Sequence, residues 1–485
     1  MLGNIPICDD IRMSGLVKFL IRRRWIAAGF LLGGSILLLP SPSGLTMSGQ
    51  KSLAIAIAAI VFFVTEPMPL PTVAVLIGVF EVLLGIAGPM EVSRSFISDS
   101  LLFIMGSLMI AETIVKQKLD KRLALAIVRL TGPRVECVVV GLIVVSALIA
   151  SFIGEHTVVA MMMPVGMTLI ASAGPEPREL KNLPALIMLA IAYGAVAAGV
   201  GSPSGGARNA IMLAYWRQLF HLQVSYLQWL KYLYPMVVLQ VPLVAWVLLK
   251  TFRPEVVDLS RSIEELRSRV AEEGTMTARD GWTVTIFLIT VFLWITASDQ
   301  IGLGTTAMIG VALYLMTGIA HWEDFSRGIN WGVIFIYGGA ISLGITMRDT
   351  GAANWTAQWV LRGLEPLGLH GGIPMLFFVA LLTMALASVM SSGATVGLLA
   401  PVTLHMADLS GTSIVATGLV TAVASAFTFM TPIGSPACGM VYSSGYLKRA
   451  DFIKAGWKMT VVSLGLLMLM AFGYWRLLAF PEGGG

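Results

Sequence analysis

The sequence predicts an all-α polytopic membrane protein, built as an inverted repeat with two re-entrant hairpins. The first observation is composition, because 56% of the 485 residues are hydrophobic and only 12% are charged. That charged fraction is about half of what a soluble domain carries. The second observation is a series of apolar segments of membrane-spanning length. The third is a pair of apolar segments that are too long for one span and are interrupted midway by polar residues.

The spanning-length segments continue along the whole chain, and we expect about eleven transmembrane helices. They lie near residues 25–40, 53–65, 69–88, 100–115, 182–214, 233–252, 281–297, 302–319, 331–347, 412–443 and 457–479. The first segment follows a basic cluster and has no small-residue cleavage site, so we expect it to remain as an anchor. With a cytoplasmic N-terminus, the basic loops 116–134, 253–279 and 448–458 all face the cytoplasm, as the positive-inside bias requires. We therefore expect a protein of the bacterial inner (plasma) membrane, with its C-terminus outside.

Two segments, near 137–172 and 373–407, are expected to fold back as hairpins. The first is interrupted at Gly154-Glu155-His156 and the second at Ser391-Ser392-Gly393. Irregular backbone at membrane depth is tolerated only where protein groups or a water-filled cavity provide hydrogen bonds to its N–H and C=O groups. Two such tips in corresponding halves of a chain predict a binding site near the bilayer midplane.

The order of parts repeats in the two halves. The segment 103–107 is similar to 335–339, a hairpin follows each, and a span broken by glycine and proline follows each hairpin, at 201–206 and 431–436. The two hairpins then enter from opposite faces, which is typical of an inverted repeat. The expected parts are a first scaffold part (1–136), a first transport part (137–252), a cytoplasmic connector (253–280), a second scaffold part (281–372) and a second transport part (373–485).

At each hairpin tip the second arm begins a new helix, and a new helix is also expected after Gly206 and after Pro436. Thr157 and Thr395 are the expected N-caps at the two tips. Four helix N-termini that converge on one point present free N–H groups and the positive ends of helix dipoles. This arrangement favours a carboxylate or another oxyanion, so we expect a small anionic substrate.

Three ionisable residues, Glu155, His156 and Arg208, are expected at depths where charge is costly and is usually functional or paired. One interpretation is an internal Glu155–Arg208 ion pair that fixes the hairpin to the broken span. The other makes Arg208 a ligand of the substrate anion, with Glu155 or His156 binding and releasing a proton that drives transport. Ser392 and Ser435 are candidate donors to the same anion.

Other features of the sequence argue against other functions. The cysteines at 8, 137 and 438 have neither disulfide nor zinc spacing, so we expect no metal site and no cofactor. No metalloprotease helix, nucleophile elbow or Walker-type phosphate loop is present, so we expect neither an enzyme nor an ATP-driven pump. The basic residues lie beside spans, which excludes a nucleic-acid partner. We expect a solvated helix in the connector, with Ile263, Leu266 and Val270 at helical spacing, and interfacial histidines at 221, 321, 370 and 405.

Several motifs in their correct order resemble the divalent-anion:sodium symporter (DASS) family, the dicarboxylate, citrate and sulfate carriers of the wider ion-transporter superfamily. Residues 65–71 are similar to that family's Thr-Glu-x-x-Pro junction, and residues 201–209 to its Gly-Thr-Pro-x-Gly-Thr-Pro-Pro-Asn break. Residues 429–436 and 444–446 are similar to the matching break and its trailing Gly-Ser-Gly-Tyr. The resemblance covers nearly the whole chain. It implies a homodimer in which a scaffold stays fixed while a transport domain, with both hairpins and both broken spans, moves as an elevator.

This chain departs from the family at the expected site. In such relatives each tip carries Ser-Asn-Thr, which contacts the substrate carboxylates and helps to hold sodium, and both of these motifs are altered here. Ala207-Arg208 stands where the family has Pro-Pro, although Asn209 is kept, and Ala437-Cys438 replaces Pro-Asn. We therefore expect Arg208 or His156 to supply the positive charge that sodium supplies elsewhere. Sodium itself is a doubtful cofactor.

The predicted function is secondary active transport of a small organic, dicarboxylate-like anion by an elevator mechanism, through proton coupling or exchange. Because a carboxylate at Glu155 repels a dianion, a monoanion, a zwitterion or a cation stays open as the substrate. The alternatives are a proton or cation antiporter of the same superfamily, with Glu155 as the ion site, and a transport-inactive membrane sensor. The expected partners are the substrate, membrane lipid and a second copy of the chain. The predicted substrate-binding residues are Gly154, Glu155, His156, Thr157, Gly206, Arg208, Asn209, Ser391, Ser392, Gly393, Thr395, Ser435 and Pro436, with Glu155 and His156 also coupling.

Overall fold

The computed structural model describes residues 15–117, 132–174, 180–272, 276–432, 434–478 and 480, with side chains from residue 24 onward except at 269, 270 and 272. Within these ranges the chain forms helices and turns, with one isolated bridge between Arg134 and Asp258. The predicted all-α class is therefore confirmed. The predictions for Cys8, for most of the basic loop 116–134, for the Val270 side chain and for the C-terminal tail lie outside the described residues.

In the first half of the chain, every predicted span contains a helix, and the segment 182–214 divides into two. The elements are α1 (Gly15–Leu38), α2 (Met47–Thr65), α3 (Leu70–Leu83), α4 (Pro89–Phe96), α5 (Asp99–Lys116), α7 (Val135–Ile153), α8 (Glu155–Ala171), α9 (Asn182–Ala198), the short helix η2 (Pro203–Gly205), α10 (Ala207–Phe220) and α11 (Tyr226–Thr251).

The second half has the same succession after a connecting helix. Its elements are α12 (Ser260–Glu272), α13 (Ala278–Thr296), α14 (Ser298–Ile301), α15 (Leu303–Met316), α16 (Trp322–Gly328), α17 (Trp331–Asp349), α18 (Ala352–Leu364), η3 (Glu365–Leu367), α19 (Gly372–Ala387), α20 (Ser392–Ser410), α21 (Ile414–Ala424), α22 (Pro436–Ser443), α23 (Arg449–Phe472) and η4 (Tyr474–Leu477).

Among the described residues, seven helices are long and apolar enough to cross a membrane. They are α2, α4 continued by α5, α7, α11, α13, α17, and α23 continued by η4. The other predicted spans contain shorter apolar helices, such as α3, α9, α15 and α21. A short helix that ends inside the molecule leaves backbone N–H and C=O groups at its end that other parts of the protein must hydrogen-bond. Hairpins and broken spans contain helix ends of this kind.

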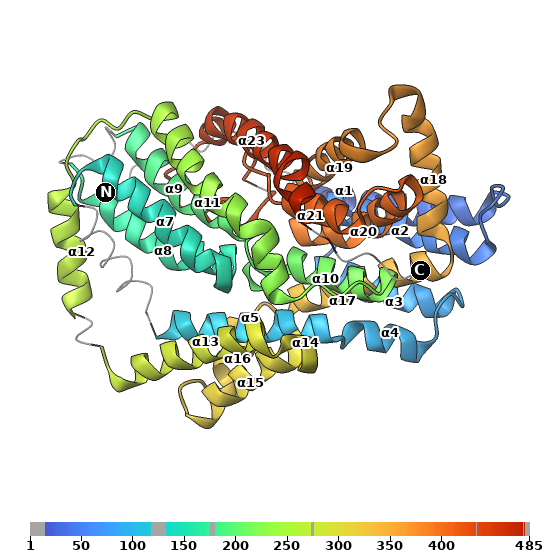
Figure 1. The fold of residues 1–485 in the computed structure, drawn as a ribbon, viewed down its shortest axis with the longest axis horizontal. Coiled ribbons are helices and arrows are strands. Elements are labelled where there is room, and N and C mark those ends of the chain that lie inside the picture. Colours follow the sequence, from blue (N-terminus) through green and yellow to red (C-terminus); the bar gives the residue numbers. More distant parts are fainter. Residues whose placement is uncertain are drawn as a thin grey trace.

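The first hairpin is formed by α7 and α8. The two helices meet at Gly154, whose φ of 97° lies in a region that favours glycine. At the open end, the N–H of Val135 donates to the carbonyl of Val257 in the connector, and α8 packs against α12 of the same connector. Both arms therefore begin and end on the same side, as predicted, and Figure 1 shows them beside α9 and α11.

The second hairpin is formed by α19 and α20, with its tip at 388–391. Its open end is closed by the N–H of Gly372, which donates to Oγ1 of Thr412 at 2.9 Å. The Ser410 hydroxyl also lies 3.3 Å from the sulfur of Met375. The start of α19 is thus adjacent to the end of α20, and this segment also folds back as predicted.

The two halves of the chain pack into each other. The helix α5 packs along α15 of the second half, while α17 packs along α3 of the first half. One element in this region was not predicted, namely α18, which together with η3 lies at 116° to α19. It buries a narrow stripe of alanines at 352, 353 and 357 and leaves Trp359 exposed. In Figure 1 it stands on the right-hand side of the molecule.

The connector is not fully solvated, which corrects the prediction for this segment. The helix α12 forms as expected, but Leu266 is only 3% exposed and the helix packs against α8. Glu255 also accepts hydrogen bonds from the N–H groups of residues 181, 182 and 183, at 3.1, 2.7 and 3.1 Å. The connector therefore attaches to the base of the first hairpin and caps the N-terminus of α9.

Candidate functional site

A cavity lies where the two hairpin tips and the two broken spans meet. Its volume is about 80 Å³, which is more than a single water needs. Residues 154–156, 206–208, 391–393 and 436 contribute to its wall. These ranges contain the starts of α8, α10, α20 and α22. The predicted convergence of four helix N-termini is therefore present.

Arg208 and Glu155 form a two-pronged ion pair inside this region. Nη2 of Arg208 lies 2.8 Å from Oε2 of Glu155, and Nη1 lies 3.2 Å from Oε1. Both residues are buried, with 3% and 5% of their surface exposed. The internal pair predicted as one interpretation is thus seen. A paired arrangement of this kind is the geometry in which a guanidinium recognises carboxylates.

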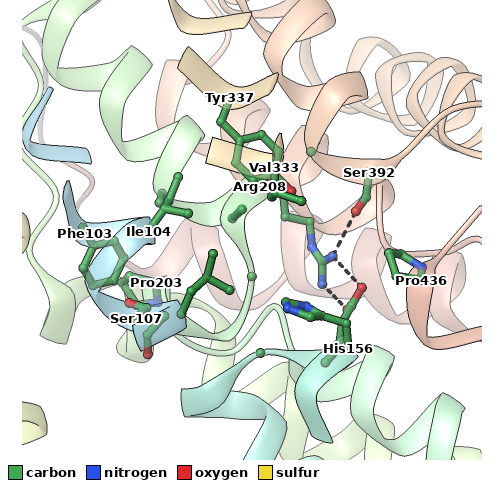
Figure 2. A pocket seen from close by; sticks show the side chains of 18 of the residues that line it. Phe103, Ile104, Ser107, His156, Pro203, Arg208, Val333, Tyr337, Ser392 and Pro436 are labelled. Carbon is green, nitrogen blue, oxygen red and sulfur yellow. Dashed lines mark hydrogen bonds and ion pairs between the residues drawn. The ribbon is translucent and has the colours of Figure 1, made fainter. Parts of the chain in front are cut away.

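Two serines from the second half of the chain join this pair. Nη1 of Arg208 donates to the Ser392 hydroxyl at 3.3 Å, and the Ser435 hydroxyl donates to Oε1 of Glu155 at 3.4 Å. Ser392 begins α20 and Ser435 is the N-cap of α22. Figure 2 shows the guanidinium between the two halves, with dashed contacts to both. The candidate serines are therefore brought to the predicted place.

The predicted N-caps at the hairpin tips are wrong. The first tip is capped by the Gly154 backbone, and Thr157 lies within the first turn of α8, outside the cavity wall. At the second tip the cap is Ser391, whose hydroxyl accepts from the N–H of Ala394 at 3.4 Å. Thr395 is buried and donates to the Ser391 carbonyl at 3.1 Å. Each helix begins earlier than expected, so both threonines fall inside it.

Asn209 holds the first broken span together. Its Nδ2 donates to the carbonyls of Gly199 and Ser202, at 2.9 and 2.7 Å, and its side chain is fully buried. It does not line the cavity. A Cβ on Gly199 would lie 3.0 Å from Oε2 of Glu155 and 3.2 Å from Nη2 of Arg208. The absence of a side chain there lets the broken span approach the ion pair.

His156 lies at the cavity beside the guanidinium (Figure 2). Its side chain is exposed, and no hydrogen bond or ion pair to it is present in the part of the chain that the structure describes. The imidazole is thus accessible from the cavity. His405, by contrast, is not interfacial, because it is buried with Nδ1 2.6 Å from the Pro401 carbonyl.

The wall of the cavity that faces the ion pair was not predicted from the sequence. This wall comes from α5 and α17, with Phe103, Ile104 and Ser107 on one and Val333 and Tyr337 on the other. The Ser107 hydroxyl is buried, and no protein partner accepts or donates to it among the described residues. Ser107 itself contributes to the cavity wall. The sequence signal for this wall is the pair of similar segments at 103–107 and 335–339, which contain the residues named above except Val333.

The site combines the guanidinium of Arg208, which is bound to Glu155, with the accessible imidazole of His156, several hydroxyls and an apolar wall. This is suited to holding a small molecule that carries a carboxylate at one end. The structure provides no group of three or more histidine, cysteine, aspartate or glutamate side chains suited to a metal ion, within the described ranges.

Comparison with protein families places this chain among membrane carriers. The family described as "Sodium:sulfate symporter transmembrane region" matches residues 23–480. The sodium-dependent dicarboxylate transporter SdcS of Staphylococcus saprophyticus is 22% identical over 464 residues, covering 90% of this chain and 88% of the relative. The sodium-dependent high-affinity dicarboxylate transporter 3 of Caenorhabditis elegans is 25% identical over 458 residues, covering 84% and 80%.

Two solved structures share the fold. MtrF of Neisseria gonorrhoeae, described with a class of antimetabolite efflux pumps, aligns with a TM-score of 0.57 at 12% identity, covering 98% of each chain. The YdaH transporter of Alcanivorax borkumensis aligns with a TM-score of 0.56 at 14% identity, covering 96% of this chain and 100% of that one. At such low identity these likenesses establish architecture alone.

Proposed function

The chain belongs to the sodium:sulfate symporter family, a transporter family and not an enzyme family, and on this premise we propose that it carries a small dicarboxylate-like anion by proton coupling or exchange. Relatives named as sodium-dependent dicarboxylate transporters support the substrate class. The observation that carries the proposal is the Arg208–Glu155 pair at the cavity. The guanidinium of Arg208 is placed to bind a carboxylate through two nitrogens, and in this structure the carboxylate that it binds is that of Glu155.

The proposed mechanism is an exchange of carboxylates on Arg208. When Glu155 is protonated it loses most of its attraction for the guanidinium, and a substrate carboxylate takes its place. After release of the substrate, Glu155 gives up its proton and returns to Arg208. The guanidinium is then never left buried without an anion, which is the costly state for such a group.

The charges in the site set the expected number of protons. The empty site is neutral when Arg208 and Glu155 are both ionised and His156 is not. A dianion adds two negative charges, and protons on Glu155 and His156 neutralise both. We therefore propose that a dianion is carried with two protons and without net charge, which avoids moving charge through the membrane interior.

The proposed moving body consists of the first transport part (137–252) and the second (373–485). The helix starts around the cavity all come from these parts, while α5 and α17 of the scaffold parts form the opposite wall. A sliding movement between the two would carry the site across the bilayer as an elevator. We further propose a homodimer in a bacterial inner membrane, with the N-terminus cytoplasmic and the C-terminus outside, from the basic loops and the family membership.

Transport by purified protein in liposomes tests the proposal. With radiolabelled succinate outside, we expect accumulation when the lumen is more alkaline than the medium, equally in sodium-containing and sodium-free buffer. An imposed membrane potential should leave the rate unchanged. If accumulation requires sodium, the proposed coupling is wrong. If neither succinate nor any other carboxylate or sulfate-type anion moves under any gradient, the carrier hypothesis fails and a transport-inactive sensor is favoured.

A second candidate function is a proton or cation antiporter. It is favoured by one observation, namely that Glu155 is the carboxylate among the described residues that line the cavity. In that case Glu155 binds the ion and no organic anion is needed. The Arg208→Ala variant separates the two, because an anion carrier loses substrate affinity, whereas a cation antiporter only shifts its pH profile.

A further inference from the structure

A second buried carboxyl group lies away from the cavity, at the contact between α3 and α17. Glu81 on α3 has 0% of its surface exposed. The Ser342 hydroxyl lies 2.5 Å from its Oε2, and the Thr346 hydroxyl lies 2.8 Å from its Oε1. Both hydroxyls belong to α17. Acidic residues at such positions in membrane proteins are rare and usually functional.

Within the described ranges, no cation compensates Glu81. The elements packed against α3 are α2, α4 and α17, and the charged groups on them are directed elsewhere. Lys51 of α2 donates to the Leu84 carbonyl at 2.8 Å, and Glu91 of α4 accepts from the N–H of Gly88 at 2.8 Å. The remaining charged groups on these helices are Arg94, which is exposed, and Arg348, which pairs with Asp349. On the nearby α10, Arg208 pairs with Glu155 and Arg217 lies 3.7 Å from Asp99. The tyrosines are Tyr337, which lines the cavity, and Tyr215, which donates to a backbone carbonyl. Among the described residues, Glu81 has no ion pair.

The available hydrogens fit a neutral carboxyl. Thr346 has one hydroxyl hydrogen and two acceptors within reach, Oε1 of Glu81 at 2.8 Å and the Ser342 carbonyl at 3.0 Å. If Glu81 is protonated, its O–H donates to Thr346, Thr346 donates to the Ser342 carbonyl, and the Ser342 hydroxyl donates to Oε2. Each hydrogen then has its own acceptor. If Glu81 is ionised, a full charge is buried without a cation, which is far more costly.

The helix that receives these hydrogen bonds also forms part of the candidate site. Tyr337 and Val333 on α17 line the cavity. On the side of the second hairpin, a Cβ on Gly397 of α20 would lie 2.5 Å from Cβ of Ala340. The Tyr215 hydroxyl lies 2.8 Å from the Ala340 carbonyl and 2.6 Å from the Gly397 carbonyl. The helix α17 therefore lies between Glu81 and the hairpin that carries Ser392.

We propose that Glu81 is a proton-binding site in the α3–α17 contact, separate from the proton sites of the cavity, and that its proton holds α17 in the position that shapes the cavity wall. The ligand is a proton, and the residues that bind it are Glu81, Thr346 and Ser342. This inference does not depend on which substrate the cavity binds. Because the folded protein holds a proton that the unfolded chain releases near neutral pH, stability falls as pH rises through the titration of this site.

Infrared spectroscopy of the purified full-length protein tests the proposal directly. A protonated carboxyl has a carbonyl stretch well separated from the amide bands, and we expect such a band near neutral pH. In the Glu81→Gln variant that band should be lost, while the amide reproduces the hydrogen-bond pattern of the neutral acid. The fall in melting temperature with rising pH should also disappear. The matched control is Glu66→Gln, an exposed acid at the turn between α2 and α3, which should leave both measurements unchanged.

A second variant keeps the test decisive if Glu81→Gln does not fold. Thr346→Val keeps the shape of the side chain but removes a hydroxyl that would donate to an ionised carboxylate more strongly than it accepts from the neutral acid. The carboxyl band should therefore persist to higher pH than in the wild type. A band that is absent in the wild type, that persists in Glu81→Gln, or that titrates identically in Thr346→Val overturns the proposal.

Discussion

Arg208 donates from Nη1 to the hydroxyl of Ser392 across 3.3 Å, and this contact joins the first half of the chain to the second. The same nitrogen lies 3.2 Å from Glu155, on the tip of the other hairpin. One side chain thus connects both hairpin tips at the cavity. Any ligand that removes Glu155 from Arg208 also acts on the contact between the two halves.

The first prediction separates the structural role of Arg208 from its role in binding. Arg208→Ala leaves Glu155 buried without a partner, and we expect a loss of about 3–5 kcal/mol in the free energy of unfolding. The double variant Glu155→Ala with Arg208→Ala should recover most of that stability, because no isolated charge remains. Neither variant should bind succinate. Thermal unfolding with and without succinate measures both effects, and binding by the stable double variant would exclude Arg208 as a ligand.

The second prediction concerns the proton on Glu155. Glu155→Gln keeps the size of the side chain but fixes it in a neutral state, so Arg208 stays available to the substrate. We expect exchange of internal for external succinate to continue, while accumulation driven by a pH gradient is reduced, because only the proton on His156 remains to couple it. Counterflow and gradient-driven uptake in the same liposomes distinguish these outcomes. Gradient-driven accumulation at the wild-type level would show that Glu155 is not the coupling group.

The third prediction concerns the contact between the second hairpin and α17. A Cβ on Gly393 would collide with the ring of Tyr337, lying 2.9 Å from its Cζ and also from its hydroxyl oxygen. Gly393→Ala should therefore displace the hairpin, cost about 1–3 kcal/mol and lower the transport rate. Combining it with Tyr337→Leu should recover part of the rate by making room.

The control for this prediction is Gly363→Ala in α18, where an added Cβ meets nothing within 4 Å. It should leave transport unchanged and should not lower stability, because alanine has a higher helix propensity than glycine. If Gly393→Ala behaves like this control, the contact between the hairpin tip and α17 does not restrict the site.

The fourth prediction concerns Glu255, which lies in the connector outside the spans. Burial alone would raise the pKa of this carboxyl, but the backbone N–H groups of Asn182, Leu183 and Lys181 outweigh it and lower the pKa below its usual value. A lowered pKa means that the carboxylate stabilises the fold above the pKa of the unfolded chain, about 4.3, and that this stability is lost as the pH falls through the lower folded value.

Glu255→Gln should therefore cost about 1 kcal/mol at neutral pH, as loss of a helix cap does. The difference from the wild type should vanish in acid, as measured by thermal unfolding across pH. A difference that persists at low pH would mean that the charge of Glu255 does not stabilise α9.

The positions of the hairpins and of the helix starts were predictable because their causes are local. The breaks at Gly154 and Ser391 interrupt apolar sequence, and α10 begins at Ala207, directly after Gly206 as expected. The caps were not predictable in the same way. Gly154 adopts a φ of 97° and is the N-cap, so α8 already begins at Glu155 and Thr157 lies inside the helix. A choice of cap depends on small differences in backbone geometry that composition does not reveal.

The sequence by itself determined that this is a helical membrane protein with two interrupted hairpins, because hydropathy and the need to satisfy backbone groups act along short stretches of chain. Only the tertiary structure decided which side chains meet. Glu155 and Ser435 are separated by 280 positions, and Glu81 and Ser342 by 261. Whether a buried carboxyl finds an arginine, as Glu155 does, or only two hydroxyls, as Glu81 does, depends on how distant helices pack.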